Sequence, residues 1–129
     1  LRDQLAGARL EALGVGVGQI ASSLIFSGDG EPLLVLTSGA HRVDTAKVAA
    51  TLGVASLDRA DPAFVRTATG QAIGGVAPVG HPAPVRTLVD LALADHDEVW
   101  AAGGIPHAVY RTTFDELVRV TDGTPTEVA

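Results

Sequence analysis

Residues 69–81 read TGQAIGGVAPVGH and place four glycines and one proline within thirteen positions. Glycine permits backbone conformations with φ > 0 and lets a ligand approach the main chain closely. Successive N–H groups in such a segment can hold a carbonyl oxygen or an oxyanion. The segment lacks the Lys and Ser/Thr of a P-loop and the spacing of a dinucleotide-binding fingerprint. Two interpretations therefore stay open, an ordinary glycine-rich turn and a loop that binds a carbonyl-bearing or anionic ligand.

The segments before this stretch predict a helix and a hairpin. Residues 1–13 carry apolar side chains at helical spacing, which predicts an opening helix. Residues 23–26 and 33–37 are short apolar runs on either side of Gly-Asp-Gly at 28–30. Glycine and aspartate are typical turn residues, so these two runs predict a β-hairpin.

Three further helices are predicted from capping patterns. Each begins after a residue whose side chain can accept a hydrogen bond from the first turn. They are expected over residues 45–52 after Asp44, over residues 62–68 after Asp61, and from Thr113 through Val120. Gly53 and Gly70 follow the first two as stop signals.

Short apolar runs bounded by Gly or Pro predict the remaining strands. These runs are residues 54–57, 73–79, 85–89, 98–102 and 107–111. The tail after Gly123 is expected to be loose. Strands outnumber helices and do not alternate with them, which disfavours a doubly wound parallel sheet. We expect an α/β (mixed α+β) fold with a mixed, largely antiparallel sheet of about six or seven short strands, barrel-like, with flanking helices.

Length and composition fit one folded domain over residues 1–129. The chain is 47% hydrophobic, which suffices for a core and argues against disorder. Position 1 is Leu and the sequence contains no Met, so we expect that an N-terminal piece is missing. No run approaches 18 apolar residues and no signal peptide is visible, so we expect no membrane contact and a cytoplasmic location.

Charge and aromatic content narrow the class of partner. The net charge is −6 and aromatics make up 4%, which disfavours tight DNA binding and a base-stacking platform. Eight of the nine cations are Arg, the better phosphate ligand. A local RNA-binding patch therefore stays open, with Arg42, Arg66 and Arg111 as candidates.

Metal and cofactor sites are not indicated. The chain has no Cys, and its four histidines show none of the spacings of metal ligands. They are His41, His81, His96 and His107. His107 follows Gly103-Gly104 at the end of an apolar run, where it could donate a hydrogen bond or act as a base. A histidine with purely structural hydrogen bonds fits that position too.

Other polar groups carry weaker signals. Ser22 and Ser23 stand at the start of the predicted hairpin without a G-x-S-x-G motif, so a serine hydrolase is disfavoured. The acidic run at 95–98 is typical of a solvated loop. Lys47, the single lysine, falls on the helix predicted after Asp44 and is expected to face solvent.

Taken together, these segments resemble the YbaK-like family of aminoacyl-tRNA deacylases, whose fold also occurs as the editing domain inserted in bacterial prolyl-tRNA synthetases. The most specific motif is the G-x-x-x-P element from Gly74 to Pro78, which follows Thr69-Gly70. The resemblance extends over nearly the whole chain, through residues 18–26, 43–49, 52–53, 60–62, 69–80, 102–104 and 113–117.

The resemblance implies hydrolysis of the ester in a mischarged tRNA, tRNA-Pro or a related one, without cofactor, metal or protein nucleophile. By the resemblance, Gly74 and Gly75 lie against the aminoacyl carbonyl and the terminal ribose, a substrate ribose hydroxyl assists the attacking water, and His107 lines the pocket. Implied substrate-binding residues are Ser22, Thr69, Val76, Ala77, Pro78, His81, Gly103 and Gly104. Expected partners are the 3′ end of tRNA and a tRNA synthetase. A monomer and a homodimer both stay open.

One position departs from the family pattern. Many members carry a functional lysine just before the small or hydroxyl residue of the first strand, and here that position is Ser22. We expect Ser22 to face the pocket from this strand. The alternative function is a non-catalytic binding module of the same fold for aminoacyl-RNA, an amino-acid-like ligand or a synthetase.

Overall fold

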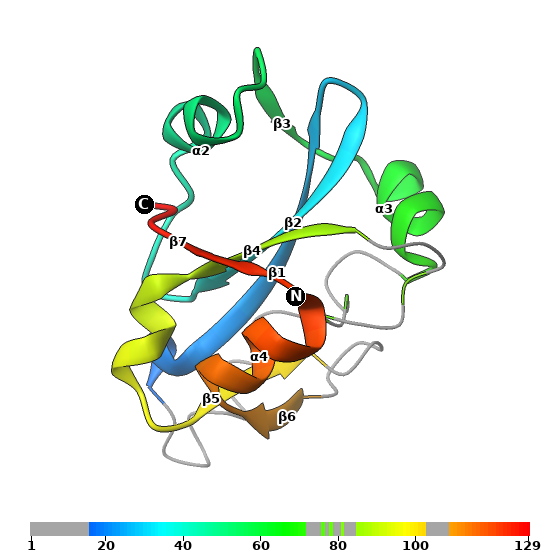
Figure 1. Ribbon diagram of the computed structural model, residues 1–129. Coiled ribbons are helices and arrows are strands. Elements are labelled where there is room, and N and C mark those ends of the chain that lie inside the picture. Colours follow the sequence, from blue (N-terminus) through cyan, green and yellow to red (C-terminus); the bar gives the residue numbers. More distant parts are fainter. Residues whose placement is uncertain (1–15, 72–75, 77, 79–80, 82–84, 103–108) are drawn as a thin grey trace.

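A computed structural model of the chain (Figure 1) describes residues 16–71, 76, 78, 81, 85–102 and 109–129. The opening helix expected over residues 1–13 lies outside the described residues. Most of the strand expected at 73–79 does so too, and its two described residues, Val76 and Pro78, are not in a strand.

Seven strands form one mixed sheet, as predicted. They are β1 (Ile20–Gly28), β2 (Glu31–Ser38), β3 (Leu57–Arg59), β4 (Arg86–Asp90), β5 (Val99–Ala102), β6 (Val109–Thr112) and β7 (Thr124–Thr126). Their order is β6-β5-β1-β2-β4-β7, and β3 also pairs with β1. The longest ladder, β1 with β2, is antiparallel, as are β1–β3 and β5–β6. The ladders β1–β5, β2–β4 and β4–β7 are parallel. Within the described residues β6 and β7 end the order, so backbone hydrogen bonds there do not close a barrel.

Three α-helices and two 3₁₀ turns complete the described fold. The helices are α2 (Thr45–Leu52), α3 (Pro62–Thr69) and α4 (Phe114–Thr121), and the turns are η1 (Val17–Gln19) and η2 (Leu91–Asp95). Figure 1 shows α2 and α3 on opposite sides of the β1–β2 hairpin. Helix α4 packs beside β4 and η2.

Local signals explain where these elements begin and end. Asp29 and Gly30 both have positive φ, 52° and 83°, as a tight two-residue hairpin turn requires. The Asp44 carboxylate accepts the Lys47 N–H at 3.0 Å, and Gly53 ends α2 in the left-handed conformation. Asp61 and Thr113 cap α3 and α4 in the same way. The hairpin and the three helix starts predicted from sequence are confirmed.

The sheet packs a separate apolar cluster on each face. Ala21, Ile25 and Leu36 belong to the cluster that also takes residues of α3 and α4, which we call the α3/α4 face. Phe26 and Val35 belong to the cluster that takes residues of α2, which we call the α2 face. Successive side chains of a strand alternate between these faces.

Two predictions near the edges were wrong. The strand expected at 54–57 is β3, which lies at Leu57–Arg59 instead. It is displaced because residues 57–59 are the ones that pair with residues 26–28 of β1. The tail is not loose: β7 pairs with β4, and Val128 beyond it is fully buried in the α2-face cluster. The open edge of β4 supplies the hydrogen-bond partners that a polar tail lacks by itself.

Candidate functional site

The structure describes part of the predicted site. Ser22, Thr69, Val76, Pro78 and His81 lie in the described residues. The remaining predicted site residues lie outside the described residues; they are Gly74, Gly75, Ala77, Gly103, Gly104 and His107.

Val76 anchors the glycine-rich segment on the sheet. Its side chain is 3% exposed and belongs to the α3/α4-face cluster with Ala21 of β1 and Ala101 of β5. Pro78 is buried as well, whereas His81 is partly buried. Val76 therefore packs against the α3/α4 face of the sheet, to which β1 and β5 both contribute.

Thr69 closes α3 at the point where this segment begins. The Thr69 hydroxyl donates to the Val65 carbonyl at 2.7 Å and accepts the Gln71 N–H at 3.1 Å. Gly70 follows in the left-handed conformation with φ 72°. Because the hydroxyl is used within this turn and Thr69 is fully buried, its position indicates that it orients the segment.

Adjacent serines of β1 point to opposite faces of the sheet. Ser22 lies opposite Thr37, in the alternation of the α2 face. Ser23 lies opposite Leu36, in the alternation of the α3/α4 face, where Val76 packs. The pleat thus brings Ser23, and not Ser22, to the face that carries the described part of the glycine-rich segment.

Ser23 is a polar residue of this face that the sequence patterns did not assign to the site. Its Oγ is buried and has no hydrogen-bond partner in the part of the chain that the structure describes. Its strand neighbours on that face, Ala21 and Ile25, are apolar core residues. The two-residue alternation of Ala21, Ser23 and Ile25 was the available sequence signal.

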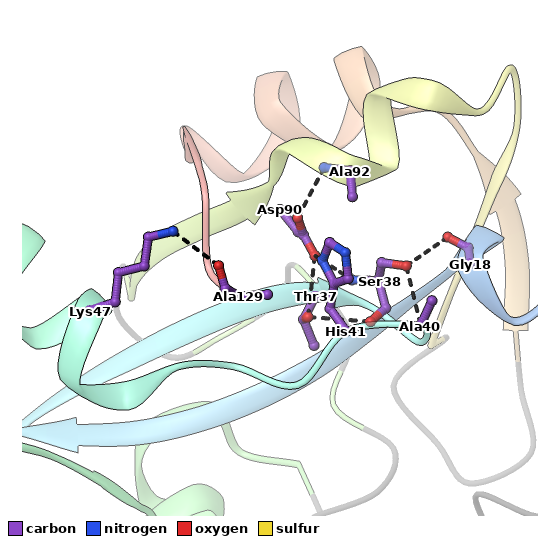
Figure 2. A network of polar contacts seen from close by, with 9 residues as sticks. All are labelled: Gly18, Thr37, Ser38, Ala40, His41, Lys47, Asp90, Ala92 and Ala129. Carbon is purple, nitrogen blue, oxygen red and sulfur yellow. Dashed lines mark hydrogen bonds and ion pairs between the residues drawn. The ribbon is translucent and has the colours of Figure 1, made fainter.

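A separate polar network joins the ends of β2 and β4 (Figure 2). Asp90 is 2% exposed, and its carboxylate accepts N–H groups of Ser38 and Ala92, each at 3.0 Å. Thr37 donates its hydroxyl to the same carboxylate at 3.4 Å. His41 Nδ1 lies 2.9 Å from Asp90 Oδ2. A carboxylate can only accept hydrogen bonds. In this contact Nδ1 of His41 is therefore assigned as the donor and carries a proton.

A cavity of about 480 Å³ adjoins this network. It is lined by His41, Asp90, Leu91, Ala92, Asp95, Glu127, Val128 and Ala129. Its charged lining is acidic and includes no Lys or Arg among the described residues, so the cavity repels phosphate. This network is therefore a poor place for the backbone of a nucleic acid.

The cations differ in whether they already have an acidic partner. Arg111 pairs with Glu98 at 3.4 Å, and Arg119 pairs with Glu116. The exposed Arg42 and Arg66 form no ion pair within the described ranges. Of the three arginines predicted to contact RNA, these two are the ones left available for phosphate.

Lys47 does not occupy the position of the family lysine. Its ammonium donates to the Ala129 carbonyl at 3.0 Å, and 41% of its side chain is exposed.

In the described residues no group of three or more His, Asp or Glu side chains could hold a metal ion. No described helix is both long and apolar enough to cross a membrane.

Comparison with known proteins assigns the family. A model of the aminoacyl-tRNA editing domain matches residues 6–120. The chain belongs to the aminoacyl-tRNA editing domain family. This match covers the glycine-rich segment and the β1–β2 hairpin together.

Relatives of this editing domain occur both alone and within synthetases. YwhH of Bacillus subtilis is 32% identical over 108 residues, which are 83% of this chain and 68% of YwhH. A proline–tRNA ligase of Nitratidesulfovibrio vulgaris is 34% identical over 91 residues, or 70% of this chain. The matched region spans only 16% of that ligase.

Solved structures agree with the editing-domain fold. The crystal structure of a candidate trans-editing enzyme for prolyl tRNA synthetase is 42% identical and superimposes with a TM-score of 0.90. The match covers 95% of this chain and 78% of that one. The fold class predicted from sequence is confirmed.

Proposed function

We propose that this protein is a trans-editing deacylase that hydrolyses the ester between a wrong amino acid and the 3′ adenosine of a tRNA, tRNA-Pro or a related one. One observation carries the proposal, the editing-domain match over residues 6–120. The burial of Val76 supports it, because a loop that binds an ester must be held firmly by its scaffold. The proposal treats the chain as a single editing domain that acts in the cytoplasm.

The chemistry asks little of the protein beyond positioning. In the proposed reaction the oxygen of a water bonds to the aminoacyl carbonyl carbon, the ester C–O bond breaks, and the ribose oxygen leaves with a proton. Gly74 and Gly75 offer N–H groups to the oxyanion, and a substrate ribose hydroxyl assists the water. His107 lines the pocket. Neither a metal nor a cofactor enters this reaction.

A second editing site meets a physical need of translation. The aminoacylation site of a tRNA synthetase binds amino acids that differ by one methylene with free energies only about 1–3 kcal/mol apart. Attachment of the wrong amino acid is therefore expected when the amino acids are small. A separate domain that hydrolyses the wrong ester removes those products. In this proposal the protein binds tRNA as its partner, and it could act next to a tRNA synthetase.

The alternative is a non-catalytic module of the same fold. Ser22 at the position of the family lysine favours it, because a serine cannot supply an ammonium group to a phosphate or a carbonyl. Such a module would bind aminoacyl-RNA, an amino-acid-like ligand or a synthetase without hydrolysing an ester.

A deacylation panel separates these functions. The purified protein is incubated with tRNA-Pro carrying Ala, Ser, Thr or Cys, with Pro-tRNA-Pro and a no-enzyme reaction as controls. The deacylase proposal expects faster loss of at least one wrong amino acid and no loss of proline. Equal decay with and without protein would support the binding module. A parallel arm with EDTA should leave the rate unchanged, and loss that zinc restores would contradict the metal-free reaction.

A further inference from the structure

One buried hydroxyl of the sheet stands out by its lack of a partner. Ser23 Oγ is shielded from solvent and lacks a hydrogen-bond partner within the described part of the chain. Buried polar groups are almost always paired, and those that are not need an explanation. A bound ligand that reaches this hydroxyl would supply the partner that the described residues do not.

Its surroundings make this hydroxyl distinctive. Ala21 and Ala101, which pair across β1 and β5, are small, and both lie in the α3/α4-face cluster. Val76 of the glycine-rich segment belongs to the same cluster. Ser23 as a whole is only partly buried, so the strand reaches the surface at this position. The arrangement is one polar group on a face whose apolar cluster includes the small Ala21 and Ala101, the larger Ile25 and Leu36, and Val76 of the glycine-rich segment.

We infer that Ser23 determines which aminoacyl group is accepted, by forming a hydrogen bond with a hydroxyl on its side chain. This inference rests on the proposed function and adds the substrate class: seryl or threonyl esters in preference to alanyl esters. A seryl group satisfies the buried Oγ, whereas an alanyl group leaves it unpaired. Small neighbours at positions 21 and 101 suit a short side chain.

Among the described residues, this hydroxyl makes no hydrogen bond that would stabilise the free protein. Removing an unpaired buried hydroxyl takes away a desolvation penalty without breaking a hydrogen bond. Ser23→Ala is therefore expected to unfold at the same denaturant concentration as the wild type or at a higher one. If the Ser23 hydroxyl stabilised the fold, Ser23→Ala would instead unfold at a lower denaturant concentration than the wild type.

The chain supplies a matched control for this substitution. Ser27 lies on β1 in the same alternation as Ser23, but opposite Pro32 near the hairpin turn. Ser27→Ala removes the same atom from the same strand. Only Ser23→Ala should change the choice between aminoacyl groups.

The first measurement is the ratio of initial deacylation rates on Ser-tRNA-Pro and Ala-tRNA-Pro. Ser23→Ala should lower the Ser-to-Ala ratio about tenfold, as expected for one lost hydrogen bond, while the control Ser27→Ala retains it. A Ser-to-Ala ratio that is unchanged in Ser23→Ala would overturn the inference while leaving the deacylase proposal intact. A lower unfolding midpoint for this variant would also overturn it.

The second measurement needs no activity. Adenosine carrying a 3′-seryl or a 3′-alanyl group through an amide, which resists hydrolysis, is titrated into wild type and variants by calorimetry. Ser23→Ala should weaken binding of the seryl compound about tenfold and leave the alanyl compound unaffected. Equal weakening of both compounds, or of neither, contradicts the inference. Selective seryl binding without deacylation would support Ser23 and exclude the deacylase.

Discussion

His41 and Asp90 form a hydrogen-bonded pair, with His41 Nδ1 2.9 Å from Asp90 Oδ2, in which only one partner is accessible. The His41 side chain is 37% exposed and that of Asp90 is 2% exposed. Asp90 also accepts the N–H groups of Ser38 and Ala92 from two different elements (Figure 2). The carboxylate is the centre of this junction, and the histidine covers it from the solvent side.

This asymmetry predicts unequal effects of removing each partner. Asp90→Ala leaves two N–H groups without their acceptor and should lower the free energy of unfolding by about 2–4 kcal/mol. His41→Ala leaves Asp90 with its backbone donors and should lower it by about 1 kcal/mol. Urea unfolding of both variants measures the difference. A larger loss for His41→Ala would show that the imidazole, and not the backbone N–H groups, stabilises the junction.

Val128 should be required for stability although it stands outside every strand. Its side chain is fully buried in the α2-face cluster, so Val128→Ala should reduce the free energy of unfolding by about 2 kcal/mol. Glu127→Ala is the control, because its ion pair with Lys47 spans 3.8 Å between exposed groups and contributes little. Thermal or urea unfolding tests both. Equal unfolding midpoints for wild type and Val128→Ala would contradict the packing role.

Tyr110 should ionise at unusually high pH. Burial, and secondly the negative charge of Glu116, raise the pKa of Tyr110 above its ordinary value of 10.0. The folded state then holds this proton more tightly than the unfolded state, so the stability contributed by Tyr110 is fully present below the unfolded pKa and is lost as pH rises through the folded pKa.

The absorbance of tyrosinate measures this directly, since the chain contains a single Tyr. The titration midpoint in buffer should exceed the midpoint in denaturant, and Glu116→Gln should reduce the difference. Coincident midpoints for the folded and unfolded chains would contradict the prediction.

Gly75→Val is expected to impair hydrolysis while the fold persists. A side chain at this position would occupy the place assigned to the ester and so take the N–H out of line with the oxyanion. Losing the geometry of one oxyanion donor typically lowers a rate about 10²–10³-fold. Circular dichroism checks the fold, and the deacylation panel gives the rate. A folded variant that cleaves at the wild-type rate would remove the glycine-rich segment from the proposed site.

Arg66 should contribute more to tRNA binding than Arg111. Glu98 already neutralises Arg111, whereas Arg66 is exposed without an ion pair in the described residues. Arg66→Gln should weaken tRNA binding and lower the slope of log K against log salt by about 1, as expected for one phosphate contact. Arg111→Gln is the control. Filter binding over a salt series measures both, and equal slopes for wild type and Arg66→Gln would exclude this contact.

Locally encoded parts of the fold could be predicted from the sequence. The turn at Asp29-Gly30 and the helix starts after Asp44 and Asp61 depend on residues within one turn of each other, and the structure confirms them. The strand β7 could not be predicted in this way, because its three residues, Thr-Pro-Thr, become a strand only beside β4. Partners distant in sequence decide such elements.

The same limit applied to the site. Ser22 and Ser23 are the same residue type at adjacent positions, so the sequence does not show which one faces the site. The register of β1 on β2, which pairs them with Thr37 and Leu36, decides which face of the sheet each one takes. Thr69 was assigned to substrate binding from its place in the motif, whereas its hydroxyl is occupied in closing α3. The assignments of Gly74, Gly75 and His107 to the site stay predictions.

The attachment of Val128 to the start of α2 bears on the order in which the chain folds. The Asp44 N–H donates to the Val128 carbonyl at 2.7 Å, across most of the sequence. Contacts between distant segments slow folding because a large loop must close before they form. During synthesis, β4 keeps an unpaired edge until β7 has left the ribosome, so until then the nascent chain exposes this strand edge to chaperones and to neighbouring chains.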